Sequence, residues 1–459
     1  MGKNNTKNKL YVGVDVGGTK IQASLVEESG TIRTSKRCPT PREANPEQIL
    51  ETIETAITEV LQSEQLGPDC LTGIGIAIPG VVDPKKGVVV ATPNINFSGA
   101  KVVKYLQPRF SAKVVLGNDC NLGTLGEAWL GSARKASSVV GILVGTGIGS
   151  GFVQKGKLWR GFRESAMEIG HMVMQVGGPV CGCGNQGCFE ALASRTAIER
   201  DIRARVEKGE QTVLTEILEG DLSLMRSSSL REALKQEDKV VTEVMRHAAE
   251  ILGHACMSIR HLFDPEVIVL GGGVMEACSN FILPIVEKIV ASDKLPGARE
   301  GGRVLLSSLG DDAVVLGAVA LARSGVGRNP FKKSYFVKQE LPQITQTSFG
   351  EITVDKETYK HDIYLMVNGK VAKRKKRLAK DKHGTSHLIG AKELSKVCKG
   401  GPEILFVGTG QSNEVELAEE GKQFLDQRLI EYQLLPTPEI VKVYNGCTQR
   451  KAALIHVTC

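Results

Sequence analysis

Residues 10–29, LYVGVDVGGTKIQASLVEES, decide the fold of this 459-residue chain. An apolar run ends at an acidic residue, a pair of glycines follows, and a second apolar run begins at a lysine. The turn residues are Asp15, Gly17, Gly18, Thr19 and Lys20. A strand, a glycine turn and a strand predict a β-hairpin whose exposed backbone amides can hold phosphate oxygens. The pattern differs from a P-loop, in which the glycine-rich turn leads into a helix.

The same pattern recurs in residues 137–161, SSVVGILVGTGIGSGFVQKGKLWRG. Its turn contains Gly145, Thr146 and Gly147. Two such hairpins, about 130 residues apart, predict two related halves that face each other across a cleft, each with one phosphate-binding turn. A third glycine cluster, Gly271 to Gly273, ends another buried strand.

Residues 164–190, ESAMEIGHMVMQVGGPVCGCGNQGCFE, have the composition of a metal site. The candidate ligands are His171, Cys181, Cys183 and Cys188, and they are bracketed by Glu168 and Glu190. Zinc prefers thiolate and imidazole ligands, and Gly182, Gly184 and Gly187 would let the loop fold tightly around it. Four protein ligands leave no open position, so we expect a structural zinc that fixes the acidic loop.

Asp119 lies where a strand ends and a helix begins, in KVVLGNDCNLGTLGEAWLG (residues 113–131). Such positions hold catalytic groups in α/β folds, next to the ligand crevice. Asp is equally suited to cap the helix that follows, so position alone leaves both roles open. Other periodic segments predict a strand over 71–83 and helices over 46–66, 240–263 and 311–323.

Composition limits the class of protein. The chain is 41% hydrophobic and 24% charged, as in ordinary globular domains. The sequence contains no run of about 18 apolar residues, so it predicts no membrane span. The cysteines outside the cluster lack the spacing of a disulfide framework, so we expect a cytoplasmic protein. The net charge is +7, and a basic run occupies residues 370–382. Without interleaved aromatic residues this run favours a solvated surface over nucleic-acid binding.

These motifs together resemble the ROK family of repressors and sugar kinases, within the actin-like ATPase superfamily. The matching segments are DVGGTK, AIPGVVD, GNDCN, VGTGIGSG, EIGH, CGCGNQGCFE and LGGGV, spread over residues 10–325. The resemblance implies an α/β, two-lobed actin-like ATPase (ribonuclease H-like) fold in residues 1–325. The small lobe would comprise residues 10–118 and the helix 311–323, and the large lobe residues 119–305.

The resemblance also implies a role for each motif. ATP phosphates would lie on the two glycine hairpins, and adenosine near Gly271 and Gly272. Asp119 would be the catalytic base, because a sugar alcohol needs a carboxylate to accept its proton as the phosphoryl group is transferred with Mg²⁺. The sugar would contact Gly80, Asn94, Asn118, Asp119, Glu168, His171 and Glu190. The family further implies a homodimer.

Some positions depart from the family pattern. Many relatives have glycine where this chain has Glu164 and Met167, and often tryptophan near the position of Phe97. These departures lie near the expected sugar pocket and leave the choice of sugar open. We expect a glucokinase, with an N-acetylhexosamine or fructose kinase as the alternative. A sugar-sensing regulator would need a DNA-binding segment, and only nine residues precede the first strand.

The last third of the chain predicts a separate small α/β domain over residues 345–459, after a linker at 326–344. An Asn368-Gly369 turn predicts a hairpin, EILFVGTG a buried strand, GKQFLDQRLIEYQ a helix, LPTPEIVKVYN a second helix and KAALIHVTC a terminal strand. The segment resembles the small family of adipogenesis-associated and complex I assembly-factor-like domains. The role of that family is unclear, so the resemblance implies a fold and no activity.

Overall fold

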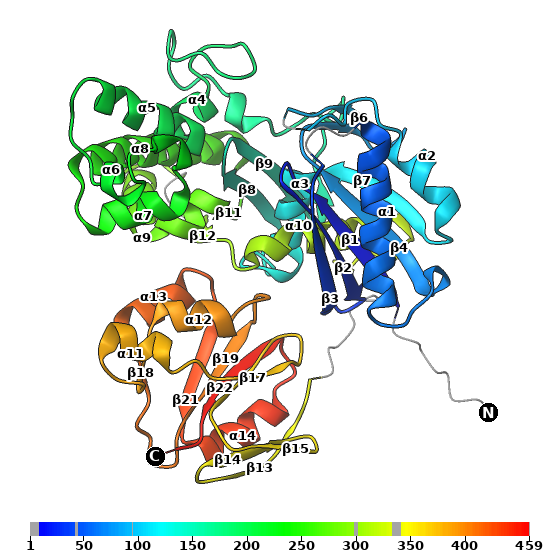
Figure 1. The fold of residues 1–459 in the computed structure, drawn as a ribbon, viewed down its shortest axis with the longest axis vertical. Coiled ribbons are helices and arrows are strands. Elements are labelled where there is room, and N and C mark those ends of the chain that lie inside the picture. Colours follow the sequence, from blue (N-terminus) through cyan, green and yellow to red (C-terminus); the bar gives the residue numbers. More distant parts are fainter. Residues whose placement is uncertain (1–8, 42–44, 94, 298–301, 333–340, 459) are drawn as a thin grey trace. The chain divides into compact units, whose positions relative to one another are not determined.

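The computed structural model describes residues 9–41, 45–93, 95–297, 302–332 and 341–458 (Figure 1). The chain forms two compact units. The first contains residues 1–122, 129–134 and 307–459, and the second contains residues 123–128 and 135–306. Asn94 lies outside the described residues, as does part of the predicted linker, residues 333–340.

The N-terminal sheet of the first unit has five strands in the order β3-β2-β1-β4-β7. The strands are β1 (Leu10–Val16), β2 (Lys20–Glu27), β3 (Ile32–Pro39), β4 (Leu71–Ile78) and β7 (Lys113–Asn118). β1, β2 and β3 are antiparallel, whereas β4 and β7 continue the sheet in parallel with β1. A short hairpin, β5 (Val81–Asp83) and β6 (Val88–Ala91), follows β4. The predicted hairpin at residues 10–29 is confirmed as β1 and β2.

Two helices pack on this sheet: α1 (Pro46–Gln62) and α10 (Ala313–Gly325). α1 buries Ile49, Ile53 and Ile57 along one face, as its 3.6-residue periodicity predicts. α10 approaches the strands so closely that a Cβ on Gly75 would lie 2.0 Å from the carbonyl oxygen of Ala318. The small-residue helix predicted at 311–323 therefore needs glycine opposite it in the sheet.

The second unit repeats this sheet, with the order β10-β9-β8-β11-β12. The strands are β8 (Ser138–Val144), β9 (Ile148–Gln154), β10 (Lys157–Leu158), β11 (Val267–Gly271) and β12 (Arg303–Leu306). Again three neighbouring strands are antiparallel and two more add in parallel. The order and direction of the strands match those of the first sheet, so the predicted duplication is confirmed at the level of topology.

Helices supply most of the second core. They are α4 (Phe189–Ala193), α5 (Arg195–Glu207), α6 (Leu214–Ile217), α7 (Ser227–Lys235), α8 (Lys239–Phe263) and α9 (Gly273–Ala291). α8 packs along α9, which contains Pro284 and a kink at Cys278. Two further helices flank β7 in the chain: α2 (Val102–Leu106) comes before β7 and α3 (Asp119–Leu130) comes after it. Across the described ranges, no helix is long and apolar enough to cross a membrane.

The C-terminal segment has a five-stranded sheet in the order β17-β16-β22-β19-β21. Its strands are β16 (Ile363–Leu365), β17 (Val371–Lys373), β19 (Ile404–Thr409), β21 (Glu431–Leu435) and β22 (Lys451–His456). Smaller sheets join β13 (Ile344–Ser348), β14 (Glu351–Val354) and β15 (Glu357–Tyr359), and pair β18 (Leu388–Ile389) with β20 (Glu416–Leu417). The helices are α11 (Arg377–His383), α12 (Ala391–Val397), α13 (Glu419–Asp426) and α14 (Thr437–Gly446).

One element of this segment was predicted wrongly. GKQFLDQRLIEYQ was expected to be a single helix, but α13 ends at Asp426 and the residues EYQ begin β21. Leu429 has a φ of 49°, which turns the chain between the two elements. β21 then pairs in parallel with β19, and this tertiary pairing overrides the helical tendency of the local sequence.

Candidate functional site

The first glycine turn is closed by its own backbone. The amide of Gly17 donates to the carbonyl of Lys20 at 2.9 Å, and the hydroxyl of Thr40 donates to the carbonyl of Gly17 at 2.6 Å. Gly18 and Thr19 are exposed at its tip, and their amides have no hydrogen-bond partner among the residues that the structure describes. The turn therefore offers two backbone donors to an anion.

Acidic and basic side chains surround this turn. Lys20 and Arg37 both pair with Asp311, at 3.4 and 3.1 Å. Burial of the Asp15 carboxyl, together with the nearby charge of Asp119, raises the pKa of Asp15 to about 7. A carboxyl group with this pKa changes its charge near neutral pH.

Asp119 and Asn118 lie together at the end of β7. The Asn118 side chain accepts from the amide of Asn121 at 3.0 Å, so Asn118 caps α3. Its amide nitrogen donates to the carbonyl of Gly80 at 2.9 Å and to Asp119 Oδ1 at 3.1 Å. The structure thus assigns the capping role, which position alone left open for Asp119, to Asn118.

The Asp119 carboxylate is held by its neighbours. Its Oδ1 accepts from the amide of Cys120 at 2.8 Å and from the Asn118 side chain at 3.1 Å. Burial raises the pKa of Asp119, and the hydrogen bonds from Cys120 and Asn118 oppose that rise. A carboxylate fixed in this way suits the role of a proton acceptor.

Gly80 has a structural reason to be glycine. Its φ is 89°, and a Cβ there would lie 2.3 Å from the carbonyl oxygen of Ala91. The turn after β4 thereby brings the carbonyl of Gly80 to Asn118. The first unit therefore gathers Gly80, Asn118 and Asp119, three of the predicted sugar ligands.

The four predicted metal ligands come together in the second unit. The ligand atoms of His171, Cys181, Cys183 and Cys188 all lie within 4.8 Å of one another. The sulfurs of Cys183 and Cys188 are 3.8 Å apart, and Cys181 Sγ is 3.7 Å from His171 Nδ1. Zinc–sulfur bonds of about 2.3 Å in a tetrahedron place two sulfurs about 3.8 Å apart, so the cluster fits that ion.

The glycines of this loop are not equivalent. Gly184 and Gly187 have φ values of 91° and 72°, and a Cβ on Gly187 would lie 1.6 Å from the carbonyl oxygen of Gln175. Gly182 has no positive φ, and a Cβ there would meet nothing within 4 Å. The conformation of the loop therefore favours glycine at positions 184 and 187 and places no such demand on position 182.

Glu190, at the start of α4, connects this loop to the second glycine turn. Its Oε2 accepts from the amide of Ile148 at 2.8 Å, and its Oε1 lies 3.7 Å from Cys181 Sγ. His171 presents Nδ1 to the cysteines, which leaves the Nε2 edge of the ring for another contact. The second unit holds Glu168, His171 and Glu190, the remaining described sugar ligands.

The loop before His171 contains strained backbone. Glu164 and Met167 have φ values of 60° and 69°, in the left-handed region that favours glycine. The Met167 carbonyl accepts from the Ser150 hydroxyl on β9, and the Glu164 carboxylate lies 3.6 Å from Arg160. The two positions at which the sequence was expected to depart from the family pattern therefore have a backbone conformation that favours glycine, with larger side chains.

The second glycine turn lies beside the third glycine cluster. Gly272 has a φ of 86°, and a Cβ there would lie 2.6 Å from the carbonyl oxygen of Val144, just before Gly145. In the turn itself, Gly145 N donates to Gly147 O at 2.9 Å. Sequence reasoning missed two residues that contact this turn, Arg195 and Thr196, because no local motif marks them.

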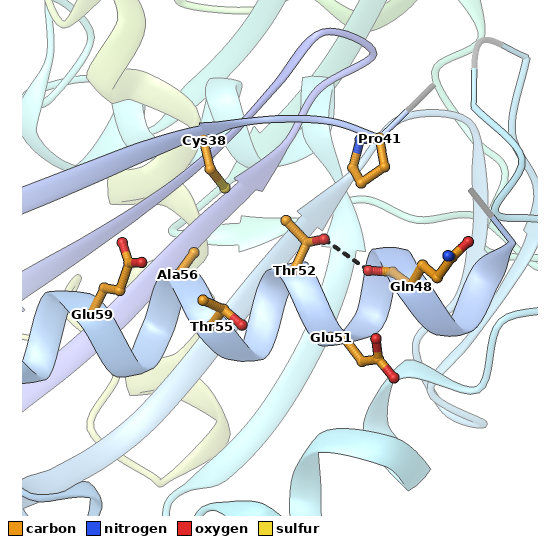
Figure 2. A pocket seen from close by; sticks show the side chains of 8 residues that line it. All are labelled: Cys38, Pro41, Gln48, Glu51, Thr52, Thr55, Ala56 and Glu59. Atoms are coloured by element: carbon orange, nitrogen blue, oxygen red, sulfur yellow. Dashed lines mark hydrogen bonds between the residues drawn. The ribbon is translucent and has the colours of Figure 1, made fainter. Parts of the chain in front are cut away.

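A separate hollow of about 610 Å³ lies between β3 and α1 (Figure 2). Its lining residues are Cys38, Pro41, Gln48, Glu51, Thr52, Thr55, Ala56 and Glu59. The Thr52 hydroxyl donates to the Gln48 carbonyl within α1 at 2.7 Å, so it is already paired. The lining includes two acids and no cation, which does not suit a phosphate, and it contains none of the predicted site residues.

Two family models match the chain. The ROK family model matches residues 11–324, and the model of a protein of unknown function (DUF498/DUF598) matches residues 344–456. The second match establishes the C-terminal domain as a recognised type. Its narrower likeness to adipogenesis-associated proteins stays a prediction.

Individual relatives agree with the first match. The glucokinase of Thermotoga maritima is 33% identical, over 69% of this chain and 98% of that protein. The xylose repressor of Bacillus spizizenii is 29% identical, over 68% of this chain and 77% of the repressor. A crystal structure of a ROK family glucokinase from Streptomyces griseus, in complex with glucose and AMPPNP, superimposes with a TM-score of 0.61 at 32% identity, covering 69% of this chain and all of that one. The chain therefore belongs to the ROK family.

Proposed function

We propose that this protein transfers the γ-phosphoryl group of ATP to a hexose, with glucose as its substrate. The observation that carries the proposal is the Asp119 carboxylate, fixed at Oδ1 by the Cys120 amide and the Asn118 side chain, in the same unit as a glycine turn with two available amides. Relatives named glucokinase, at about a third identity, support both the reaction and the sugar.

In this mechanism the predicted site residues have different tasks. Asp119 orients the sugar hydroxyl and accepts its proton as the phosphoryl group is transferred. Asn118 caps α3 and donates to Asp119 Oδ1, which keeps the carboxylate in place. Glu168 and Glu190 accept hydrogen bonds from the remaining hydroxyls, and His171 accepts or donates one. The amides of the two glycine turns hold the phosphates.

Two ions complete the proposal. Mg²⁺ would neutralise phosphate charge, and the carboxylates of Asp15 and Asp119, close enough for one to raise the pKa of the other, are the hard oxygen groups that it prefers. Zinc would fill all four positions of the His171, Cys181, Cys183 and Cys188 cluster, so we assign it a structural role. The zinc loop would then hold His171 and Glu190 in position.

The test is an ADP-release assay with MgATP and a panel of glucose, N-acetylglucosamine, N-acetylmannosamine, fructose and mannose. We expect glucose to give the highest kcat/KM. A preference for an N-acetylhexosamine or for fructose would keep the kinase and reject glucose as the substrate. Sugar binding without turnover by any of them would instead support a sugar-sensing role like that of the xylose repressor.

A further inference from the structure

The start of α5 packs directly against the second glycine turn. The backbone amide of Arg195 donates to the Gly145 carbonyl at 2.9 Å, and the Thr196 hydroxyl donates to the Thr146 carbonyl at 2.8 Å. These bonds hold the carbonyl side of the turn. The amides of Thr146 and Gly147 have no hydrogen-bond partner among the described residues, so they remain available to a ligand.

The side chain of Arg195 also contacts the turn. Its Nη2 donates to the hydroxyl oxygen of Thr146 at 2.8 Å. A guanidinium has no acceptor, so the Thr146 oxygen must accept in this bond. The hydroxyl proton of Thr146 is therefore free to be donated elsewhere, and Arg195 limits the directions in which it can point.

Arg195 is itself held in place by its helix. Its Nε lies 3.1 Å from Glu199 Oε1, one turn along α5, and Glu199 also pairs with Arg203 at 3.3 Å. The Glu199 side chain is only 13% exposed, and that of Arg195 is 26% exposed. These pairs fix the Arg195 guanidinium beside the exposed Thr146 at the tip of the turn.

We infer that Arg195 is a positioning residue for the nucleotide: it fixes the Thr146 hydroxyl as a donor to a phosphate oxygen of ATP. The hydroxyl-to-phosphate bond is charge-assisted by the phosphate, and the nearby Arg195 charge adds a Coulomb attraction to that phosphate. The inference rests on the proposed function, in which the turn at residues 145–147 binds the phosphates of ATP. It adds a residue that lies outside all three glycine clusters.

The test compares substitutions in the full chain. Arg195→Gln should raise the KM for MgATP roughly tenfold, as expected for the loss of one charged hydrogen bond, and leave the KM for the hexose unchanged. Arg195→Lys should recover part of the loss. Arg200→Gln is the matched control, because Arg200 is on the same helix, is 40% exposed, and pairs with Asp201 at 2.7 Å.

A double-mutant cycle separates positioning from a general charge effect. Thr146→Val should raise the KM for MgATP, and adding Arg195→Gln should raise it little further, because both changes remove the same oriented donor. Fully additive effects would overturn the positioning role. An Arg195→Gln variant whose KM for MgATP equals that of Arg200→Gln would overturn any role of Arg195 in nucleotide binding.

A binding measurement distinguishes failure of the proposed function from failure of the Arg195 inference. If the wild-type protein formed no ADP with any hexose, titration calorimetry with MgATP would replace the kinetic readout. A weaker Kd for Arg195→Gln than for Arg200→Gln would then uphold the inference without the kinase activity. A wild-type protein that binds no MgATP would overturn both.

Discussion

The Glu190 carboxylate lies 2.8 Å from the backbone nitrogen of Ile148, and this hydrogen bond joins the cysteine-rich loop to the second glycine turn. The same carboxylate approaches Gly147 so closely that a Cβ there would lie 2.2 Å from Oε2. Its other oxygen lies 3.7 Å from Cys181 Sγ. One side chain thus contacts both the predicted metal cluster and the predicted phosphate turn.

The Glu190 contact predicts different results for two substitutions. Glu190→Ala leaves the amide of the buried Ile148 without its acceptor, which should lower the free energy of unfolding by about 1–3 kcal/mol. Glu190→Gln keeps an oxygen acceptor and should be close to wild type in stability. Both should raise the KM for the hexose. Urea unfolding of the two variants compares their free energies of unfolding. Equal losses of stability would show that the hydrogen bond from the Ile148 amide does not contribute to the free energy of unfolding.

Asp119→Asn should abolish proton transfer and spare the local structure. Asparagine keeps an oxygen that can accept from the Cys120 amide, so the fold and sugar binding should remain. We expect kcat to fall by about a hundredfold to ten-thousandfold, with the hexose Kd from calorimetry nearly unchanged. Asp69→Asn, at an exposed acid, is the control. Near-normal turnover by Asp119→Asn would remove Asp119 from the role of base.

Cys183→Ser should release the metal from the cluster. Cys183 is exposed, so the smaller oxygen is tolerated sterically, but a hydroxyl is a poor replacement for a thiolate ligand of zinc. Elemental analysis should find one zinc per wild-type chain and a loss of it in the variant, with a higher KM for the hexose. Cys70→Ser, outside the cluster, should keep the metal. Full activity in a metal-free wild-type protein would contradict a structural zinc.

The raised pKa of Asp15 predicts a stability that depends on pH. An unfolded aspartate titrates near 3.9, whereas the pKa of Asp15 in the folded protein is about 7. Between these values the folded state binds more protons than the unfolded state, so this group makes stability fall as pH rises from about 4 to 7. Asp15→Asn removes that contribution.

The comparison is between wild type and Asp15→Asn without nucleotide. Asp15→Asn should be the more stable protein at pH 8, by on the order of 2 kcal/mol after allowance for the partial exposure of the carboxyl, and the two should converge towards pH 4. Thermal unfolding at pH 5 and pH 8 measures the difference. A constant difference at the two pH values would mean that Asp15 titrates normally.

Two truncations test where the kinase part ends. Arg328 donates to the buried carboxylate of Glu28, and Arg323 donates to the Glu28 carbonyl at 2.7 Å. A chain ending at Phe331 keeps both arginines and should retain kinase activity. A chain ending at Arg323 loses Arg328 and the last residues of α10, and should melt at a lower temperature because Glu28 loses a charged partner. An inactive 331-residue chain would show that the C-terminal domain completes the kinase.

Prediction from sequence worked best where a motif is local. The two hairpins, the helix at residues 46–62 and the clustering of His171, Cys181, Cys183 and Cys188 all follow from spacings of a few residues or from one short stretch. The helix expected across Asp426 to Gln433 failed for a tertiary reason, since EYQ is recruited as an edge strand beside β19. Local periodicity contains no information about that partner.

The duplicated hairpins, the cysteine-rich loop and the position of Asp119 follow from the sequence alone, because each is a short pattern of residue types with one favoured geometry. The tertiary structure adds that Asn118 caps α3 and donates to Asp119 Oδ1, that Glu190 binds the Ile148 amide, and that Arg195 contacts Thr146. The last two contacts span 42 and 49 residues. Such contacts form when packing brings distant segments together, and the residues between them do not encode the pairing.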